Sequence, residues 1–414
     1  MKIIDGVVNM HPKMMYTYVG IDSHKDTHTA VFLDCFFEKL GELTFDNLPS
    51  KFPDFLNNAL KLQQDGTTLL FGLEDISMYG RTFAVFLKNN GQPFKHVNSL
   101  LVARERRTQT SIQKTDTIDA ECAARILLSK FGELPDVQPD DRFWMLKTLI
   151  MRRNFIVKNN ISLKNHLHSL LTQHYPNYRT LFPSFDNKAA LAFFLKYPSP
   201  STLEGITESE LTSFLRQHRC KFFLTKGKEI LETLQDTTVD FQNIRDAAVQ
   251  STVRQIQFNI DELQRLDHSL ADAFALFETT LTSMTGLGLT SAAQMLAHIG
   301  DIRRFSSPAK LARYSGIAPV TYASGKRETQ YANQRGNREL NTLFYLLAVR
   351  LIATSRSGNM RNAFFHEYYH RKISEGKTKN QAIKCVQRRL VNIIWGMLTH
   401  GKKYDNPLLS PKHP

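Results

Sequence analysis

Four carboxylates stand where two apolar strands end and a helix begins, a placement that can form a metal site. Asp22 ends an apolar run that starts at Tyr18, and Glu74 ends a second one. Asp116 and Asp119 are three positions apart, so they share one face of a helix. Hard divalent cations prefer oxygen ligands, and two such ions clamp the attacking and leaving oxygens at phosphorus. The acids therefore predict a Mg²⁺ cage for phosphodiester chemistry, in which Mn²⁺ can substitute.

The two helix acids, Asp116 and Asp119, also have a simpler structural explanation. Asp116 fits an N-cap, where Asp is favoured, and Asp119 complements a helix dipole. The two strand-end acids weaken that explanation, because a carboxylate ending an apolar strand is costly unless it is solvated, paired or metal-bound. Asp26 and Asp75 are rival ligands that the pattern does not exclude.

The elements that position these acids follow a definite order. Short β-branched or aromatic runs predict strands, and apolar residues at three- and four-residue spacing predict helices. The predicted strands cover residues 18–22, 27–33, 41–45, 67–74 and 93–97, and the predicted helices cover residues 52–62, 79–90 and 117–129. Three antiparallel strands followed by alternating helix and strand is the ribonuclease H-like, or RuvC-like, order of a mixed sheet with helices on both faces. If the first and fourth strands are neighbours, their ends place Asp22 beside Glu74.

The rest of the chain is predicted to be mostly helical. Apolar spacing predicts long helices over residues 142–175 and 256–277, either packed as ordinary core helices or forming a coiled coil between subunits. Gly286 and Gly288 resemble the hairpin of a helix-hairpin-helix, which offers backbone amides to a phosphate, although a plain helix-helix turn also fits. The expected domains are 14–135, 140–280 with a small inserted module near 176–227, and 281–405.

Charge and composition narrow the partners. The chain has 53 Lys+Arg against 39 Asp+Glu, a net charge of +14, and residues 301–414 alone contain 21 basic and 6 acidic side chains. A basic surface confined to the C-terminal part favours a polyanion such as nucleic acid. The 4 cysteines lack metal-site or disulfide spacing. Without a long apolar run or a signal peptide, we expect a cytoplasmic protein with no membrane partner.

These motifs resemble a known family. Three N-terminal segments resemble the DEDD transposases of the insertion sequence 110 family, namely Tyr18-Val-Gly-Ile-Asp22, Gly72-Leu-Glu74 and Lys114-Thr-Asp116-Thr-Ile-Asp119. Three C-terminal segments resemble that family's transposase domain, namely Tyr314-Ser-Gly316, Ala323-Ser324-Gly325 and Arg335-Gly-Asn-Arg338. The resemblance implies that the four acids bind metal and that Ser324 attacks DNA to form a covalent phosphoserine link. Ser315 is the main rival nucleophile.

The resemblance also implies partners. Similar recombinases are guided by a structured noncoding RNA, the bridge RNA, which pairs with target and donor DNA. Basic and polar residues near the serine would then contact DNA or RNA, namely Lys326, Arg327, Arg335, Asn337 and Arg338. Guidance by base pairing accounts for a chain that lacks a zinc finger, a leucine zipper or a strong helix-turn-helix. Because two duplexes must be held together, a dimer or tetramer is expected.

Three alternatives remain at this stage. A metal-dependent nuclease or Holliday-junction resolvase would use the acids alone and release hydrolysed ends. A site-specific invertase of the Piv type would share both domains but work at fixed DNA sites without a guide. A non-enzymatic RNA-binding protein would use the acids only as helix caps.

Overall fold

The structure, a computed structural model, describes residues 3–4, 7–8, 11–74, 78–108, 113–134, 141–175, 178–182, 184–185, 187–220, 223–232, 241–324, 327–331, 333 and 336–405. The chain divides into two compact units. The first unit comprises Met1–Trp144, Thr279–Gly286 and Leu296–Pro414, and the second comprises Met145–Glu278 and Leu287–Met295.

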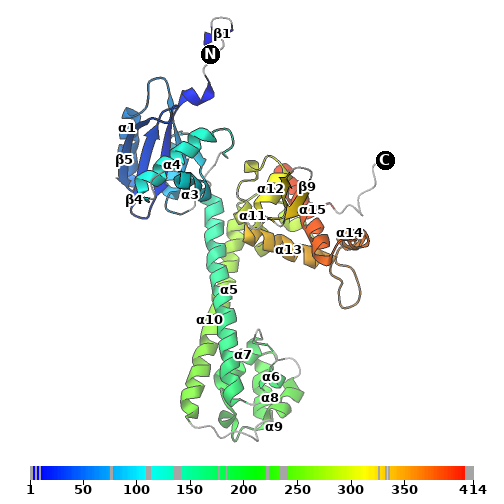
Figure 1. Ribbon diagram of the computed structural model, residues 1–414. Helices are drawn as coiled ribbons and strands as arrows, with labels where there is room; N and C mark the ends of the chain where they lie inside the picture. Colours follow the sequence, from blue (N-terminus) through cyan, green and yellow to red (C-terminus); the bar gives the residue numbers. More distant parts are fainter. Residues whose placement is uncertain are drawn as a thin grey trace. The chain divides into compact units, whose positions relative to one another are not determined.

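A five-stranded mixed sheet forms the N-terminal part (Figure 1). Its order is β5-β4-β3-β6-β7, with bounds β3 Tyr16–Ser23, β4 Thr27–Leu33, β5 Lys39–Asp46, β6 Thr68–Leu73 and β7 Phe94–His96. Strand β3 pairs antiparallel with β4 and parallel with β6. The predicted first and fourth strands are therefore neighbours, and the expectation of a mixed sheet is confirmed.

Helices bury both faces of this sheet because alternate side chains of β3 point to opposite sides. Tyr18 joins the core beneath helix α4, whereas Val19 and Ile21 join the core beneath helices α1 and α2. The helices are α1 Phe52–Lys61, α2 Arg81–Asn89, α3 Ser99–Thr108 and α4 Asp116–Ser129. By the same alternation Asp22 lies on the α4 side of the sheet.

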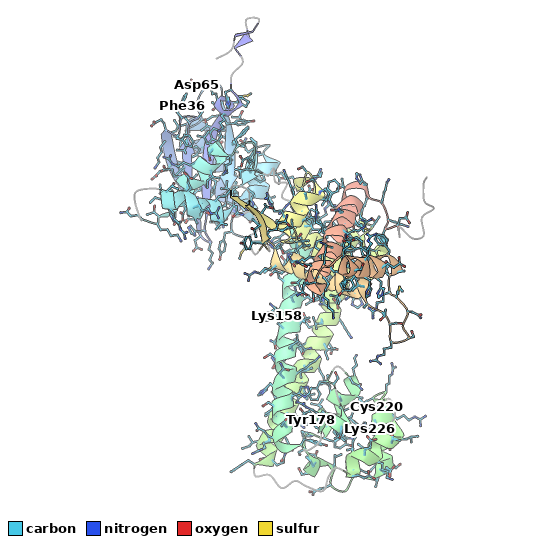
Figure 2. The ribbon with its side chains drawn as sticks, turned by 45° about the vertical axis from the view of Figure 1, so that its right-hand side comes forward. Phe36, Asp65, Lys158, Tyr178, Cys220 and Lys226 are labelled. Atoms are coloured by element: carbon cyan, nitrogen blue, oxygen red, sulfur yellow. The ribbon has the colours of Figure 1, made fainter. Side chains whose placement is uncertain are left out.

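The second unit contains two long helices that run side by side, α5 Asp141–His174 and α10 Gln242–Ala275 (Figures 1 and 2). The Arg153 guanidinium, through Nε, lies 2.6 Å from Asp267 Oδ1 and joins them. Both predicted long helices are confirmed, although α10 begins earlier than predicted. Val249 and Val253 of its earlier turns are fully buried, and the prediction did not include them.

The segment between the long helices folds as a small helical module, and its core is shared with residues of both long helices. Its elements are α6 Tyr178–Leu181, α7 Lys188–Lys196, η3 Pro200–Leu203, α8 Glu208–Gln217 and α9 Phe223–Glu232. Figure 2 labels Tyr178 and Cys220, both of which belong to this core. An inserted helical module was expected from the aromatic and turn residues of this segment.

The C-terminal part is mostly helical, as expected, but it also contains an unpredicted two-stranded hairpin. Its elements are η5 Leu281–Ser283, α11 Leu289–Ile299, η6 Ile302–Arg304, α12 Pro308–Tyr314, β8 Val320–Ser324, β9 Arg327–Tyr331, α13 Arg338–Ile352, α14 Ala363–Ser374 and α15 Lys379–His400. Shorter elements elsewhere are β1 Ile3–Ile4, β2 Val7–Val8, η1 Pro12–Met15 and η2 Pro49–Lys51. None of the helices in the described ranges is long and apolar enough to cross a membrane.

Candidate active site

Gly20 allows helix α4 to lie directly on strand β3. A Cβ atom at this position would meet the Ala120 carbonyl oxygen at 2.0 Å and the Ala124 nitrogen at 2.3 Å. This close approach brings the first turn of α4, with Asp116 and Asp119, to the end of β3 where Asp22 lies. We did not predict this role for Gly20, although a glycine inside an apolar strand often marks a close backbone approach.

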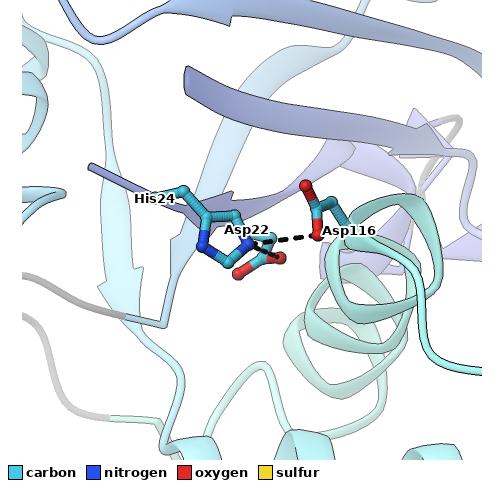
Figure 3. A group of neighbouring side chains, drawn as sticks. All are labelled: Asp22, His24 and Asp116. Atoms are coloured by element: carbon cyan, nitrogen blue, oxygen red, sulfur yellow. Dashed lines mark hydrogen bonds and ion pairs between the residues drawn. The ribbon is translucent and has the colours of Figure 1, made fainter. Parts of the chain in front are cut away.

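His24 joins two of the predicted acids (Figure 3). Its Nε2 atom lies 3.1 Å from Asp22 Oδ2 and 3.1 Å from Asp116 Oδ1. One ligand atom from each of the three residues lies within 4.8 Å of the others. His24 was not predicted as a site residue, although it is only two positions beyond Asp22 and just past the end of β3.

The environment of Asp22 shows how closely the acids gather. Burial raises the pKa of its carboxyl to about 6, and the neighbouring His24 acts in the opposite direction. The other predicted acids raise this pKa further by charge repulsion, and they are Glu74, Asp119 and Asp116. The structure therefore brings all four carboxylates together around the end of β3.

Asp119 is buried and already has a cationic partner. The Arg106 guanidinium on α3 binds its carboxylate, so an arginine that we did not predict completes this side of the cluster. Asp116 is exposed as the first residue of α4, and the N-cap is Thr115, whose side chain accepts from the Ile118 amide at 3.2 Å. The alternative of Asp116 as a cap is therefore wrong, because a hydroxyl already fills that position.

Glu74 directly follows β6 at the edge shared with Asp22. The Glu74 amide lies 3.5 Å from the Ile21 carbonyl, and the Glu74 carbonyl oxygen lies 3.2 Å from His96 Nε2. The rival Asp26 is exposed in the turn between β3 and β4. The other rival, Asp75, lies outside the described residues.

This donor set fits a divalent cation. Ligand atoms of Asp22, His24 and Asp116 lie within 4.8 Å of one another. The pKa of the Asp22 carboxyl is raised to about 6 mainly by burial, and repulsion from the other acids adds to that rise. A cation bound by several of these oxygens would remove that repulsion. Among the described residues, Asp22, His24 and Asp116 are the group whose ligand atoms lie close enough together to hold a metal ion.

Ser324 lies at the end of a hairpin in the C-terminal part. It is the last residue of β8 and pairs with Arg327, the first residue of β9. The side chains of both residues lie outside the described part of the chain, as do Lys326 and Arg335 entirely. Gly325 and Lys326, which separate the two strands in the sequence, lie outside the described residues.

The base of this hairpin is fixed by backbone contact between the segments on either side. A Cβ atom at Gly336 would lie 2.2 Å from the Gly316 nitrogen, so the two backbones touch. The Asn337 amide donates to the Tyr314 carbonyl at 2.7 Å, and Asn341 Nδ2 donates to the Ser315 carbonyl at 2.9 Å. Two of the quoted C-terminal motifs therefore pack on each other below the serine.

Ser315 has a structural role. It is fully buried at the end of α12, and its hydroxyl donates to the Leu311 carbonyl at 2.8 Å. That geometry leaves its oxygen turned back into its own helix end. The rival nucleophile is thus enclosed.

The predicted nucleic-acid contacts differ in their environments. Asn337 is the N-cap of α13, where its side chain accepts from the Leu340 amide at 2.8 Å, while Arg338 beside it is exposed. Gly286 has a φ of 82° and its carbonyl accepts from Arg350. A 3-10 turn, η5, precedes it, and α10 ended earlier at Ala275, so the expected helix directly before the glycines is absent from the described residues. The phosphate contacts themselves stay predictions.

Several known proteins are similar to this chain over nearly its whole length. The uncharacterized 44.8 kDa protein of insertion element IS116 from Streptomyces clavuligerus is 26% identical, covering 96% of this chain and 97% of its own. The 42 kDa protein of insertion element IS900 from Mycobacterium paratuberculosis is 28% identical, covering 94% and 96%. A pilin gene-inverting protein from Moraxella bovis is 22% identical, covering 95% and 98%.

Family models match both ends of the chain. A DEDD model of insertion sequence 110, described as a transposase, matches residues 19–176, and a model described as "Transposase IS116/IS110/IS902 family" matches residues 278–369. The first match contains the four clustered acids, and the second contains the Ser324 hairpin. Together the models cover more than half of the chain, which belongs to the IS110/IS116 family of transposases, enzymes that recombine DNA.

Proposed function

We propose that this transposase cuts and rejoins DNA at a composite site, in which a RuvC-like domain supplies Asp22, Glu74, Asp116 and Asp119 as Mg²⁺ ligands and Ser324 is the nucleophile. The observation that carries the proposal is the convergence of four carboxylates on the buried end of β3. The strand order β5-β4-β3-β6-β7 supports the RuvC-like assignment. The domain boundaries 14–135, 140–280 and 281–405 belong to the same proposal.

The proposed reaction conserves the energy of the phosphodiester. The Ser324 oxygen forms a bond to phosphorus and loses its proton, while the bond from phosphorus to one deoxyribose oxygen breaks and that oxygen gains a proton. When bound, Mg²⁺ would lower the pKa of an attacking oxygen and neutralise charge on the leaving one. Rejoining reverses these bond changes with a different deoxyribose hydroxyl. A hydrolase using the acids alone would form no bond to the protein.

Two serine variants test the nucleophile. Ser324→Ala should abolish a covalent protein–DNA adduct, detected after denaturing electrophoresis with labelled DNA, without weakening DNA binding. Ser315→Ala is the matched control, because losing its buried hydrogen bond should cost about 1 kcal/mol of stability yet leave the adduct. An adduct that survives Ser324→Ala, or that disappears only in Ser315→Ala, would reject Ser324.

A further variant tests the metal half of the site. Asp119→Ala should reduce DNA cleavage in Mg²⁺ by at least about a thousandfold, because the remaining ligands hold the ion and the phosphate in poor geometry. Asp26→Ala is its control, since that exposed acid lies in the neighbouring turn. Unchanged cleavage in Asp119→Ala would remove this residue from the site.

We also propose that a noncoding RNA guides the enzyme by pairing with target and donor DNA. The similarity to a pilin gene-inverting protein favours a second candidate, an unguided invertase of the Piv type that acts at fixed sites. Sequencing the nucleic acid that copurifies with the chain separates the two. One defined, structured RNA supports guidance, whereas recombination by RNA-free protein supports the invertase.

The enzyme is further proposed to act as a homodimer or tetramer. The long helices expose large apolar side chains, including Met151 at 62% and Phe155 at 60% on α5 and Phe258 at 60% on α10. Burial of these side chains against a second copy of the chain would remove apolar area from water. Combining Phe155→Ser with Phe258→Ser should lower the mass measured by light scattering, whereas Lys158→Ser on the same helix should not. A wild-type monomer would contradict the proposal.

A further inference from the structure

The last two long helices of the chain form a strongly basic surface that the proposed active site does not use. Residues 361–405 contain 10 basic and 3 acidic side chains. Helix α14 packs against α15, which brings the charges of the two helices into one small part of the fold. Surplus charge of this density is costly unless it is solvated or meets a polyanion.

Arg389 on α15 is held in place by two aromatic rings of α14. Its guanidinium carbon lies 5.0 Å from the centre of the Phe364 ring and 5.6 Å from that of Tyr368. The two rings are nearly parallel, with their centres 6.5 Å apart. Stacking on rings fixes a guanidinium while leaving its N–H edges free to bind a phosphate. Arg389 is therefore a pre-organised anion ligand.

Two more cations surround the Tyr368 ring. The Arg371 guanidinium lies 5.2 Å from the ring centre and the Lys372 ammonium lies 5.5 Å from it. Glu375 pairs with both, at 3.8 Å from Arg371 and 2.7 Å from Lys372. The Glu375 carboxylate thus pairs with two of the three cations around the Tyr368 ring, and the net charge of this cluster stays positive.

A cavity of about 360 Å³ opens beside Arg389. Arg389, Asn392 and Lys403 supply hydrogen-bond donors to it, Ile393 and Met397 supply an apolar wall, and Asp405 supplies the one carboxylate. Donors beside an apolar wall match a phosphate attached to a deoxyribose. The aromatic and cationic cluster and this cavity share Arg389, so they form one continuous surface.

We propose that this surface, made of Arg371, Lys372, Arg389, Asn392 and Lys403, binds the backbone of duplex DNA away from the phosphate that reacts. The proposal rests on the DNA-recombining function proposed above. Duplex DNA is chosen because it presents a phosphate about every 1.7 Å along its axis, an array that several cations on two rigid helices contact without reading bases. The surface would hold the flanking duplex in place during strand exchange.

The test measures binding of full-length protein to a labelled duplex in EDTA, so that cleavage plays no part. Fluorescence anisotropy is recorded from about 50 to 250 mM salt, because each lost phosphate contact lowers the slope of log affinity against log salt by about 1. Arg389→Gln should lower that slope by about 1 and weaken binding about three- to tenfold at the lower salt concentrations. Lys228→Gln, an exposed lysine of the helical module that lies 3.8 Å from Glu232, should change neither.

A second variant separates charge from the stacked geometry. Arg389→Lys keeps the charge, so it should restore the salt slope but leave binding weaker than wild type. Circular dichroism confirms folding of each variant. An unchanged slope in Arg389→Gln would overturn the proposal, as would a loss of binding confined to a structured RNA. Because binding is measured without cleavage, failure here is distinct from failure of the Ser324 assignment.

Discussion

His24 Nε2 lies 3.1 Å from Asp22 Oδ2, the spacing that two adjacent ligands have on an octahedral ion. With bonds of 2.0–2.1 Å, neighbouring ligands of such an ion lie about 3 Å apart. Asp116 Oδ1 is at the same 3.1 Å from the imidazole nitrogen. One imidazole nitrogen thus bridges two carboxylates, and a cation can take over that bridging role.

His24→Ala should therefore change which metal the site prefers. Imidazole nitrogen is a better ligand for Mn²⁺ than for Mg²⁺, so losing it should weaken Mn²⁺ binding about tenfold and Mg²⁺ binding much less. Calorimetric titration of both ions without DNA measures the two affinities. His268→Ala removes an exposed histidine of α10 and is the control. Equal losses for both ions, or none, would exclude His24 as a ligand.

The raised pKa of Asp22 predicts how stability depends on pH when no metal is bound. Burial is the largest cause of its rise from 3.8 to about 6, with added repulsion from the neighbouring acids. The folded chain holds this proton more tightly than the unfolded chain. The stability that Asp22 contributes in this way is fully present below about pH 4 and is lost as pH rises through about 6. In EDTA, Asp22→Asn should gain stability relative to wild type over that interval.

The gain expected for Asp22→Asn at pH 7 is on the order of 3 kcal/mol, from about two pKa units at 1.36 kcal/mol each. Urea unfolding at pH 4 and pH 7 measures it as a difference between the two proteins, which cancels the other titrating groups. Added Mg²⁺ should stabilise wild type at pH 7 and have little effect on Asp22→Asn. A difference that stays constant with pH would show that Asp22 is not the titrating group.

Gly20→Ala should move helix α4 away from strand β3, the two elements that carry Asp22, Asp116 and Asp119. The new Cβ would overlap the backbone of Ala120 and Ala124, so α4 must move away from β3. We expect a loss of about 1–3 kcal/mol in stability and at least a tenfold loss in metal affinity, because Asp116 and Asp119 move with α4. Gly132→Ala is the matched control, since a Cβ there meets no atom within 4 Å. Equal metal affinities for the two variants would contradict this role of Gly20.

The sequence predicted the sheet well because its signals are local, and the same signals drew attention to the acids at the strand ends. Alternating and continuous apolar runs located the strands, and a carboxylate that ends such a run is costly enough to stand out, as Asp22 and Glu74 do. The residues that complete the site gave weaker signals. His24 lies just past a strand end in a polar turn, and Arg106 reaches Asp119 from a helix of mixed polarity, so only packing reveals either contact.

The hairpin that carries Ser324 was harder to predict from the sequence. The hairpin strands β8 and β9 have five residues each and include charged and polar side chains, so their pattern resembles a loop. These strands are held by the contact between Gly316 and Gly336, which lie before β8 and after β9 in the sequence. A contact between two backbones leaves no trace in apolar spacing. The resemblance of the surrounding motifs, rather than periodicity, singled out Ser324.

Gly336→Ala tests whether that contact positions the serine. Its Cβ would lie 2.2 Å from the Gly316 nitrogen, so the two segments below the hairpin must separate. We expect the yield of the covalent protein–DNA adduct to fall at least tenfold, with about 1–3 kcal/mol lost in stability, because the hairpin base no longer closes. Gly396→Ala in α15, where a Cβ meets no atom within 4 Å, should be neutral or slightly stabilising. If the adduct forms normally in a folded Gly336→Ala protein, the contact does not position Ser324, and the serine is held by the DNA instead.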